Sequence, residues 1–156
     1  MMKFIQLFQK RIIKRNEGIP YLIRWTLFGL GKDSKYFSIK IHKILQSDSE
    51  NLHDHPWGFI SIILKGGYIE TTKFSWKLME SGWGNCTYSE CNKQNTLSKI
   101  IWPGSIIYRP ANWAHSLRIH KPCTTLVITF RKTKSWGFFT KNGYVNWKEY
   151  GKSNEC

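Results

Sequence analysis

Three histidines in this sequence have a spacing that suits a metal site. His53 and His55 lie two residues apart, and His115 follows two turns that begin at Pro103 and Pro110. Side chains two residues apart on an extended chain point to the same face, so the first two imidazoles can reach one ion. If the two segments are neighbours in a barrel, the third imidazole joins them. We therefore predict a divalent metal site at His53, His55 and His115.

The same residues also allow a plainer interpretation. A pair of histidines in a strand can face solvent, and His115 alone can be a hydrogen-bonded core residue. The other two histidines, His42 and His120, have no such neighbours and are interpreted as structural or exposed.

Three neutral imidazoles favour particular chemistries. Fe(II) held by them keeps open positions for both a substrate and O2, as a non-haem dioxygenase requires. The triad of two histidines and one carboxylate is disfavoured, because the residue two after His53 is His55 rather than an acid. Zinc with three histidines and a water would suit hydrolysis or a lyase reaction. We expect Fe(II), with zinc, manganese and nickel as alternatives.

An arginine close to this pattern points to an anionic substrate. Arg109 precedes Pro110 at the end of the strand that leads toward the third histidine. Its planar guanidinium suits a carboxylate or a phosphate, although a surface arginine would look the same. Tyr108 can donate to a bound oxyanion or can face outward. Arg109 and Tyr108 are the candidate catalytic residues, and Arg118 and Arg131 are weaker ones.

Four further residues near the histidines have two interpretations each. Trp57, Trp113 and Trp136 either line the mouth of the barrel and exclude water or are ordinary packing. Asp54 should point away from the metal, because its two neighbours point toward it. It either orients an imidazole by accepting a hydrogen bond or, as we favour, serves a turn or cap.

The elements that must position these residues are mostly strands. After Pro20 the apolar residues alternate with period two, and turn signals with glycine or proline separate the runs. The predicted strands are residues 21–28, 36–45, 58–64, 68–72, 99–102, 105–109, 115–119 and 124–131. Short strands without an internal helix indicate an all-β barrel or sandwich.

Two segments depart from this alternation. Residues 3–16 carry apolar residues on one stripe with lysines and arginines around it, which predicts a basic amphipathic helix within residues 1–18. Such a helix packs against its own sheet or lies on a membrane or an acidic partner. Residues 73–98 are polar and are interpreted as a hairpin insertion between the two halves of the barrel.

Length and composition set the class of protein. The chain has 156 residues, 24 Lys+Arg and 10 Asp+Glu, so its formal charge is +14. We expect a single domain over residues 1–156. Its four cysteines lack the second short-spaced pair of a zinc ribbon and are expected to be free thiols. No apolar run could span a membrane and the N-terminus is a poor signal peptide, so we expect a cytoplasmic protein.

Two motifs resemble those of the cupin superfamily, whose members are small double-stranded β-helix, or jelly-roll, barrels. The first runs from His53 and His55 to Gly66, and the second from the Pro103-Gly104 turn to His115. The resemblance implies two His and a Glu from the first motif and a third His from the second. Here Phe59 stands at the Glu position, and Glu70 lies beyond it and is not expected to be a ligand.

The metal pattern is therefore similar to that of three-histidine thiol dioxygenases of the cysteine dioxygenase type. Residues 53–70, 103–117 and 125–150 also resemble a group of small cupin-like proteins of bacteria and phages. Cupins include dioxygenases, isomerases, lyases and non-catalytic binders, so the resemblance specifies the fold rather than the activity.

Three functions stay open on the sequence alone. The first is a metal-dependent cupin enzyme, an Fe(II) dioxygenase that acts on a small anionic substrate. The second is a non-catalytic cupin that binds a nucleotide or another phosphate ligand, which the charge and the tryptophans favour. Nucleic-acid binding ranks last, because only charge supports it and no recognition motif is present. A homodimer is expected from exposed strand edges.

Overall fold

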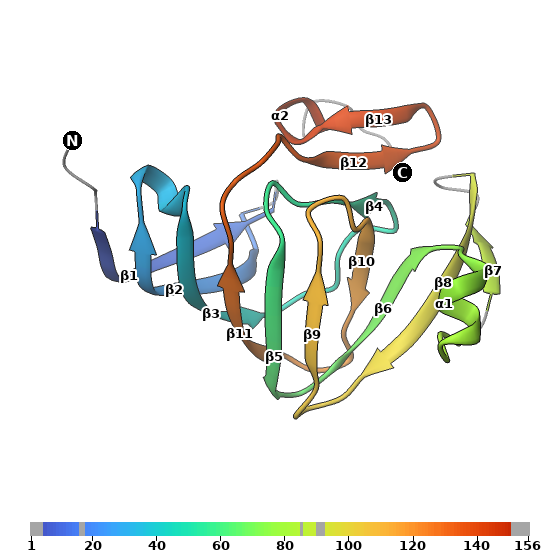
Figure 1. The fold of residues 1–156 in the computed structure, drawn as a ribbon, viewed down its shortest axis with the longest axis horizontal. Helices are drawn as coiled ribbons and strands as arrows, with labels where there is room; N and C mark the ends of the chain where they lie inside the picture. The colour runs from blue at the N-terminus through green and yellow to red at the C-terminus, as the bar shows by residue number, and fades with distance from the viewer. Residues whose placement is uncertain (1–4, 16–17, 85, 90–92, 151–156) are drawn as a thin grey trace.

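A computed structural model describes residues 5–15, 18–84, 86–89 and 93–150, and its strands pair into two antiparallel sheets (Figure 1). The first sheet contains, in spatial order, β1 (Ile5–Lys14), β2 (Pro20–Leu30), β3 (Phe37–Ile44), β11 (Cys123–Thr129), β5 (Phe59–Lys65) and β9 (Ile106–Arg109). The second contains β13 (Gly143–Asn146), β12 (Gly137–Thr140), β4 (Leu52–His53), β10 (His115–Arg118), β6 (Tyr68–Lys73), β8 (Gln94–Ile101) and β7 (Cys86–Ser89). Three short helical segments complete the elements: η1 (Lys32–Ser34), α1 (Trp76–Glu80) and α2 (Trp147–Tyr150).

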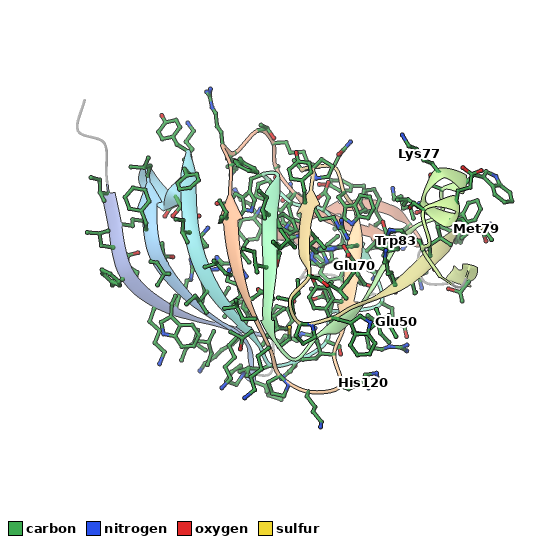
Figure 2. All side chains as sticks on the ribbon, turned by 60° about the horizontal axis from the view of Figure 1, so that its bottom comes forward. Glu50, Glu70, Lys77, Met79, Trp83 and His120 are labelled. Atoms are coloured by element: carbon green, nitrogen blue, oxygen red, sulfur yellow. The ribbon has the colours of Figure 1, made fainter. Side chains whose placement is uncertain are left out.

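The two sheets face each other and bury alternate residues between them. In β11, every second side chain from Cys123 to Thr129 is buried, and β5 and β6 show the same alternation. Figure 2 shows Glu70 of β6 in the space between the sheets, while Lys77 and Met79 of α1 lie at the far edge. The period-two pattern of the sequence thus sets which side chains line the interior.

An apolar core closes one end of this interior. It is built from Leu22, Ile44, Ile63, Tyr68, Ile101 and Cys123. The β5–β6 turn beside it has φ of 88° at Gly66, where a side chain would place Cβ 2.8 Å from the carbonyl oxygen of Pro122. Only glycine fits that position without strain, which explains the glycine of the first motif. The β12–β13 hairpin lies over the opposite end (Figure 1).

The predicted N-terminal helix is wrong. Residues 5–14 form β1, which pairs antiparallel with β2 from Ile5↔Leu30 to Lys14↔Pro20. Phe8 has φ of 50°, a value that no α-helix accommodates. Most of β1 is exposed, so no sheet face buries the apolar stripe on which the helix prediction depended. The backbone of β2 offers hydrogen-bond partners to residues 5–14 along their whole length. This pairing makes the segment a strand rather than a helix.

The hairpin insertion predicted at residues 73–98 is also not supported. Lys73 is the last residue of β6, and the short helix α1 follows it. β8 pairs with β6 from Tyr68↔Ile101 to Lys73↔Thr96, so it is a strand of the main sheet and longer than the predicted residues 99–102. β7 extends the sheet beyond it.

The remaining predicted strands have counterparts among the observed ones. The short strands β4, β12 and β13 were not predicted. Cys123 is a buried free thiol, whereas the side chain of Cys86 and all of residues 91 and 156 lie outside what is described. No described helix is long and apolar enough to cross a membrane.

Candidate metal centre

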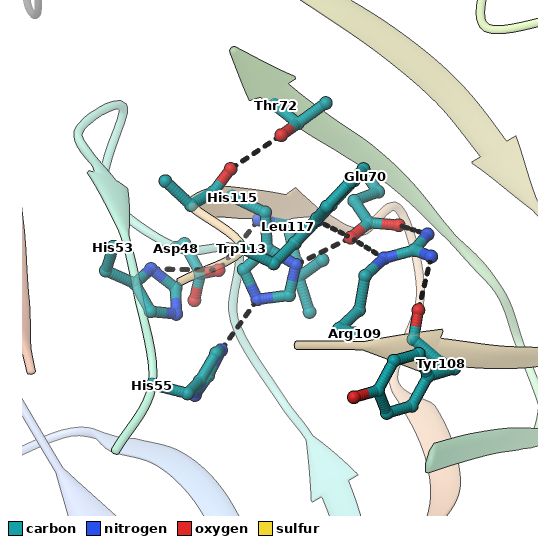
Figure 3. Close-up of polar contacts among 11 residues, drawn as sticks. Asp48, His53, His55, Glu70, Thr72, Tyr108, Arg109, Trp113, His115 and Leu117 are labelled. Carbon is teal, nitrogen blue, oxygen red and sulfur yellow. Dashed lines mark hydrogen bonds and ion pairs between the residues drawn. The ribbon is translucent and has the colours of Figure 1, made fainter. Parts of the chain in front are cut away.

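The three histidines singled out by their spacing meet between the sheets (Figure 3). His53 ends β4, His115 begins β10, and the two residues are paired directly across the sheet. One ring nitrogen from each of the three histidines lies within 4.8 Å of the others. The Nε2 atoms of His55 and His115 are 2.9 Å apart. Segments about 60 residues apart in sequence thus place three imidazoles around one point.

Backbone contacts fix the loop that carries His55. The amide of His55 donates to the carbonyl oxygen of Ala111 at 3.2 Å, which holds this loop against the turn before β10. The carboxylate of Asp54 accepts hydrogen bonds from the amide of Gly137 at 2.9 Å and from the hydroxyl of Tyr144 at 3.3 Å. It also forms an ion pair with Lys134. Asp54 therefore ties the β12–β13 hairpin to the histidine loop through contacts with distant residues, rather than through the local turn or cap expected of it.

A buried carboxylate orients His115. Glu70 of β6 has no exposed surface, and its Oε1 accepts a hydrogen bond from Nδ1 of His115 at 2.7 Å (Figure 3). Trp113 Nε1 donates to the same oxygen at 2.9 Å, and Arg109 donates to both carboxylate oxygens. An ionised carboxylate only accepts, so Nδ1 of His115 carries the proton. In the neutral ring, Nε2 then presents a lone pair toward His55.

Protonation of the site follows from burial and from these partners. Burial would raise the pKa of Glu70, but hydrogen bonds from Arg109 and His115 outweigh it and lower the pKa to about 2. Burial lowers the pKa of His53 to about 4. Burial and the adjacent rings of His115 and His53 hold the pKa of His55 well below its usual range. At neutral pH, His53 and His55 are thus neutral, the form that binds metals.

Aromatic rings enclose the histidines. The ring of Phe59 lies 4.9 Å from that of His55, centroid to centroid, and 6.2 Å from that of His115. Phe138 and Trp136, at the start of the β12–β13 hairpin, lie 5.7 Å and 6.2 Å from the ring of His53. Phe59 therefore puts an apolar ring at the position where the cupin motif has its Glu.

The donor set fits a divalent metal. Nδ1 of His53 is buried and makes no hydrogen bond within the described part of the chain, and Oδ2 of Asp48 is 3.9 Å from it. A buried polar nitrogen without a hydrogen-bond partner destabilises the folded protein when no ligand is bound. Three nitrogen donors within 4.8 Å of one another suit iron, zinc, manganese or nickel. The three histidines are the residues that would hold the ion.

The two candidate catalytic residues lie in different surroundings. The Arg109 side chain is bound to Glu70 at 2.9 Å and packs on Trp113, with 4.5 Å from its guanidinium carbon to the ring centroid. Tyr108 is 57% exposed, and its ring lies 6.3 Å from that of Phe130. Alternation in β9 directs Arg109 inward and Tyr108 outward.

The other residues considered from the sequence have different surroundings. Arg118, Arg131 and His120 are exposed. His42 is half-buried and accepts a hydrogen bond from Nε of Arg24 at 3.1 Å. Trp57 lies under Nζ of Lys40, which is 4.7 Å from its ring centroid.

Two acids that support the histidines were not identified as such. Glu70 was considered only as a ligand, although alternation in β6 places it on the same buried face as Tyr68 and Thr72, and this signal could have revealed its inward position. Asp48 accepts hydrogen bonds from the amide of Leu117 at 2.7 Å and from the hydroxyl of Tyr21. No local pattern marks Asp48, because its partners come from distant strands.

Comparison with known proteins shows a similarity in fold alone. No protein-family model matches the chain, and no curated protein matches its sequence. A cupin superfamily protein from Desulfitobacterium hafniense is 13% identical, over 76% of this chain and 82% of its own, with a TM-score of 0.47. Fe(II)-HppE with an alternative substrate is 10% identical, over 81% of this chain and 60% of its own, with a TM-score of 0.52.

The DMSP lyase DddQ from Ruegeria pomeroyi is 14% identical, over 82% of this chain and 58% of its own, with a TM-score of 0.51. The chain thus spans 60% or less of the length of HppE and DddQ, which are cupin-fold enzymes. The two facing antiparallel sheets and the histidine cluster between them agree with this likeness. The chain therefore has the fold of the cupin superfamily.

Proposed function

We propose that this chain is a metal-dependent cupin enzyme, a non-haem Fe(II) dioxygenase that acts on a small anionic substrate. The observation that carries this proposal is the cluster of His53, His55 and His115, which contains no carboxylate among the described residues. Fe(II) bound by three neutral nitrogens keeps positions at which a substrate and O2 can bind side by side. Phe59 supports the proposal, because it replaces the acid that would add a fourth protein ligand.

The residues around the histidines prepare them for this role. Glu70 keeps the proton of His115 on Nδ1 and so leaves Nε2 to bind the metal. Arg109 acts through Glu70 as a positioning residue, because it donates to both of the carboxylate oxygens. Phe59, Trp136 and Phe138 keep bulk water from the rings of His53 and His55.

The role of Tyr108 as a donor to the substrate is a proposal of its own. Tyr108 is exposed, and Arg109 donates a hydrogen bond to its backbone carbonyl oxygen. In this role, Tyr108→Phe lowers kcat with the substrate and leaves the metal content unchanged. An unchanged kcat would remove Tyr108 from the catalytic residues.

Oxygen uptake tests the proposed reaction. The protein is loaded anaerobically with Fe(II), and O2 consumption is followed with thiol-bearing acids as substrates. We expect consumption that requires both iron and substrate, that is absent from the zinc-loaded protein, and that His55→Ala abolishes. Iron-loaded protein that consumes no O2 with any of these acids would exclude thiol-bearing acids as substrates of the proposed dioxygenase. A reaction that proceeds equally well with zinc would instead indicate a lyase or hydrolase.

A second candidate function is a non-catalytic cupin that binds a nucleotide or another phosphate ligand. The net charge of +14 and the cations inside the first sheet favour it. The two candidates differ in the need for metal: a binding protein of this kind takes up its ligand in the presence of a chelator and consumes no O2. Titration with nucleotides at two salt concentrations measures that binding, because ionic attraction weakens as salt rises.

A further inference from the structure

A second polar site lies on the inner face of the first sheet, outside the histidine cluster. It is a cavity of about 420 Å³ between β1, β2, β3 and the loop after His55. Its walls carry four basic residues, Lys10, Arg11, Arg24 and Lys40, against one acid, Asp33. Thr26 and Trp57 are also part of the lining. We call this site the cationic cavity.

The innermost cations of this cavity lack a counter-charge. Lys40 is 3% exposed, and neither Lys40 nor Arg24 has a carboxylate within salt-bridge distance among the residues that the structure describes. Nε of Arg24 donates to His42, which leaves the terminal N–H groups of the guanidinium for other acceptors. Lysine is almost never fully buried without a partner, because desolvation of its charge is costly. Lys40 contacts the ring of Trp57 but has no counter-charge, so we expect that charge to come from an anion outside the chain.

The cavity and the histidine cluster share one face of the sheet. Lys40 of β3 pairs across to Val127 of β11, which pairs to Ser61 of β5, and all three are buried. Phe59 lies two residues from Ser61 on the same face, and its ring contacts that of His55 at 4.9 Å. Trp57, which lines the cavity, is two residues beyond His55 in the chain. A ligand in the cavity would thus lie on the same sheet face as Phe59, whose ring contacts that of His55.

We propose that the cationic cavity binds the phosphate group of a small substrate, with Lys40 and Arg24 as its main contacts. Two converging cations match the two negative charges of a phosphomonoester, whereas a carboxylate would balance only one. Burial of Lys40 limits access to a small molecule and disfavours a nucleic-acid backbone, which would require exposed cations. This inference rests on the proposed function and specifies the class of its anionic substrate.

Methyl phosphate, a minimal phosphomonoester, is the probe for this site. Its binding is measured by calorimetry to the iron-loaded protein and to protein treated with a chelator, with methyl sulfate as a singly charged analogue. We expect methyl phosphate to bind both forms, more weakly at high salt, and methyl sulfate to bind less well. Lys40→Met and Arg24→Gln should each weaken the binding by about tenfold or more. The matched control is Lys43→Met, which removes an exposed lysine of the same strand.

The outcomes separate this inference from the proposed function. His55→Ala should lose the metal and keep methyl phosphate, whereas Lys40→Met should keep the metal and lose methyl phosphate. Equal weakening by Lys40→Met and Lys43→Met would overturn the proposal, because net charge rather than the cavity would then control binding. Absence of binding at low salt would also overturn it, while the iron content would still test the metal centre. Binding only to the metal-loaded form would place the phosphate on the metal instead.

Discussion

The two polar sites inside the protein balance buried charge in opposite ways. At the histidine cluster, Glu70 meets Arg109, and the imidazoles of His53 and His55 are neutral at pH 7. In the cationic cavity, neither Lys40 nor Arg24 forms an ion pair with a described carboxylate. A site whose buried charges are paired holds its side chains in a fixed geometry without a ligand. A site with unpaired charges obtains its counter-charge when a ligand binds. This difference suggests a rigid metal centre beside a substrate site that gains stability from its anion.

The largest effect should follow from removal of the buried acid. Glu70→Gln leaves the Arg109 charge buried without its partner and replaces one of the two acceptor oxygens with an amide NH2, which cannot accept a hydrogen bond. We expect the free energy of unfolding to fall by about 3–5 kcal/mol and the metal affinity to fall by about 10- to 100-fold. Urea unfolding and a competition assay with a metal indicator measure the two quantities.

The exposed acid Glu50 supplies the control for this variant. Glu50→Gln makes the same chemical change at the surface and should alter stability by less than about 0.5 kcal/mol. Equal losses in the two variants would contradict the view that Glu70 organises the histidine cluster.

A smaller loss is expected where the hairpin is tied to the histidine loop. Asp54→Asn removes the charge that pairs with Lys134 and weakens the acceptor for Gly137. We expect a loss of about 1–3 kcal/mol, as for a buried hydrogen bond to a charged group. Hydrogen exchange should accelerate in residues 137–146 and stay unchanged in β5 and β11. Uniform acceleration over all strands would show instead that Asp54 supports the whole fold.

The unbalanced site should reveal itself in the pH dependence of stability. Burial, together with the nearby charge of Arg24, lowers the pKa of Lys40 from 10.5 to about 7. Between pH 7 and 10.5 the unfolded chain therefore binds this proton and the folded chain does not, so stability rises with pH. We expect a gain of about 1 kcal/mol per pH unit in this window. Below pH 7 both states hold the proton, and this contribution is constant.

Thermal or urea unfolding at pH 7 to 10 measures the gain in stability. Comparison of the wild-type protein with two lysine variants shows how much of this gain is due to Lys40. Lys40→Met should flatten the rise, whereas Lys43→Met should keep it. Methyl phosphate should reduce the rise in the wild-type protein, because a bound dianion favours charged Lys40. If stability rises equally with pH in the wild-type protein, Lys40→Met and Lys43→Met, the rise is due to other groups.

Glu70 should make stability rise with pH as well, but in the acid range. Its pKa is about 2 in the folded protein against an ordinary 4.5, so its ion pair contributes fully above about pH 4.5. That contribution is lost as pH falls from 4.5 toward 2. The loss should be absent from Glu70→Gln, and unfolding at pH 3 and pH 6 makes the comparison. An identical acid dependence in both proteins would contradict a carboxylate that is ionised at Glu70.

The histidine cluster was predictable because its signal is local. The two-residue spacing of His53 and His55 predicts a shared face on an extended chain, and the turns before His115 mark the second segment. The inner strands β3, β5 and β11 were predicted for the same reason, since their burial alternates with period two. Local patterns are therefore sufficient where one side of the strand is buried and the other is not.

Features that depend on distant partners could not be predicted in this way. The apolar residues of β1 fit a helical stripe, but its structure is decided by the open edge of β2. β4 has only two residues and exists because β10 and β12 flank it. From its residue type alone, Lys40 would be predicted to lie at the surface. Only the register of the sheet places its side chain in the interior.

Metal stoichiometry tests the central claim most directly. The wild-type protein and the His115→Ala and His120→Ala variants are loaded with Fe(II), desalted and analysed by atomic emission. The account predicts one metal per chain in the wild-type protein and in His120→Ala, whose histidine is exposed, and none in His115→Ala. Wild-type protein that stays metal-free after loading, or His115→Ala protein that keeps the metal, would contradict it.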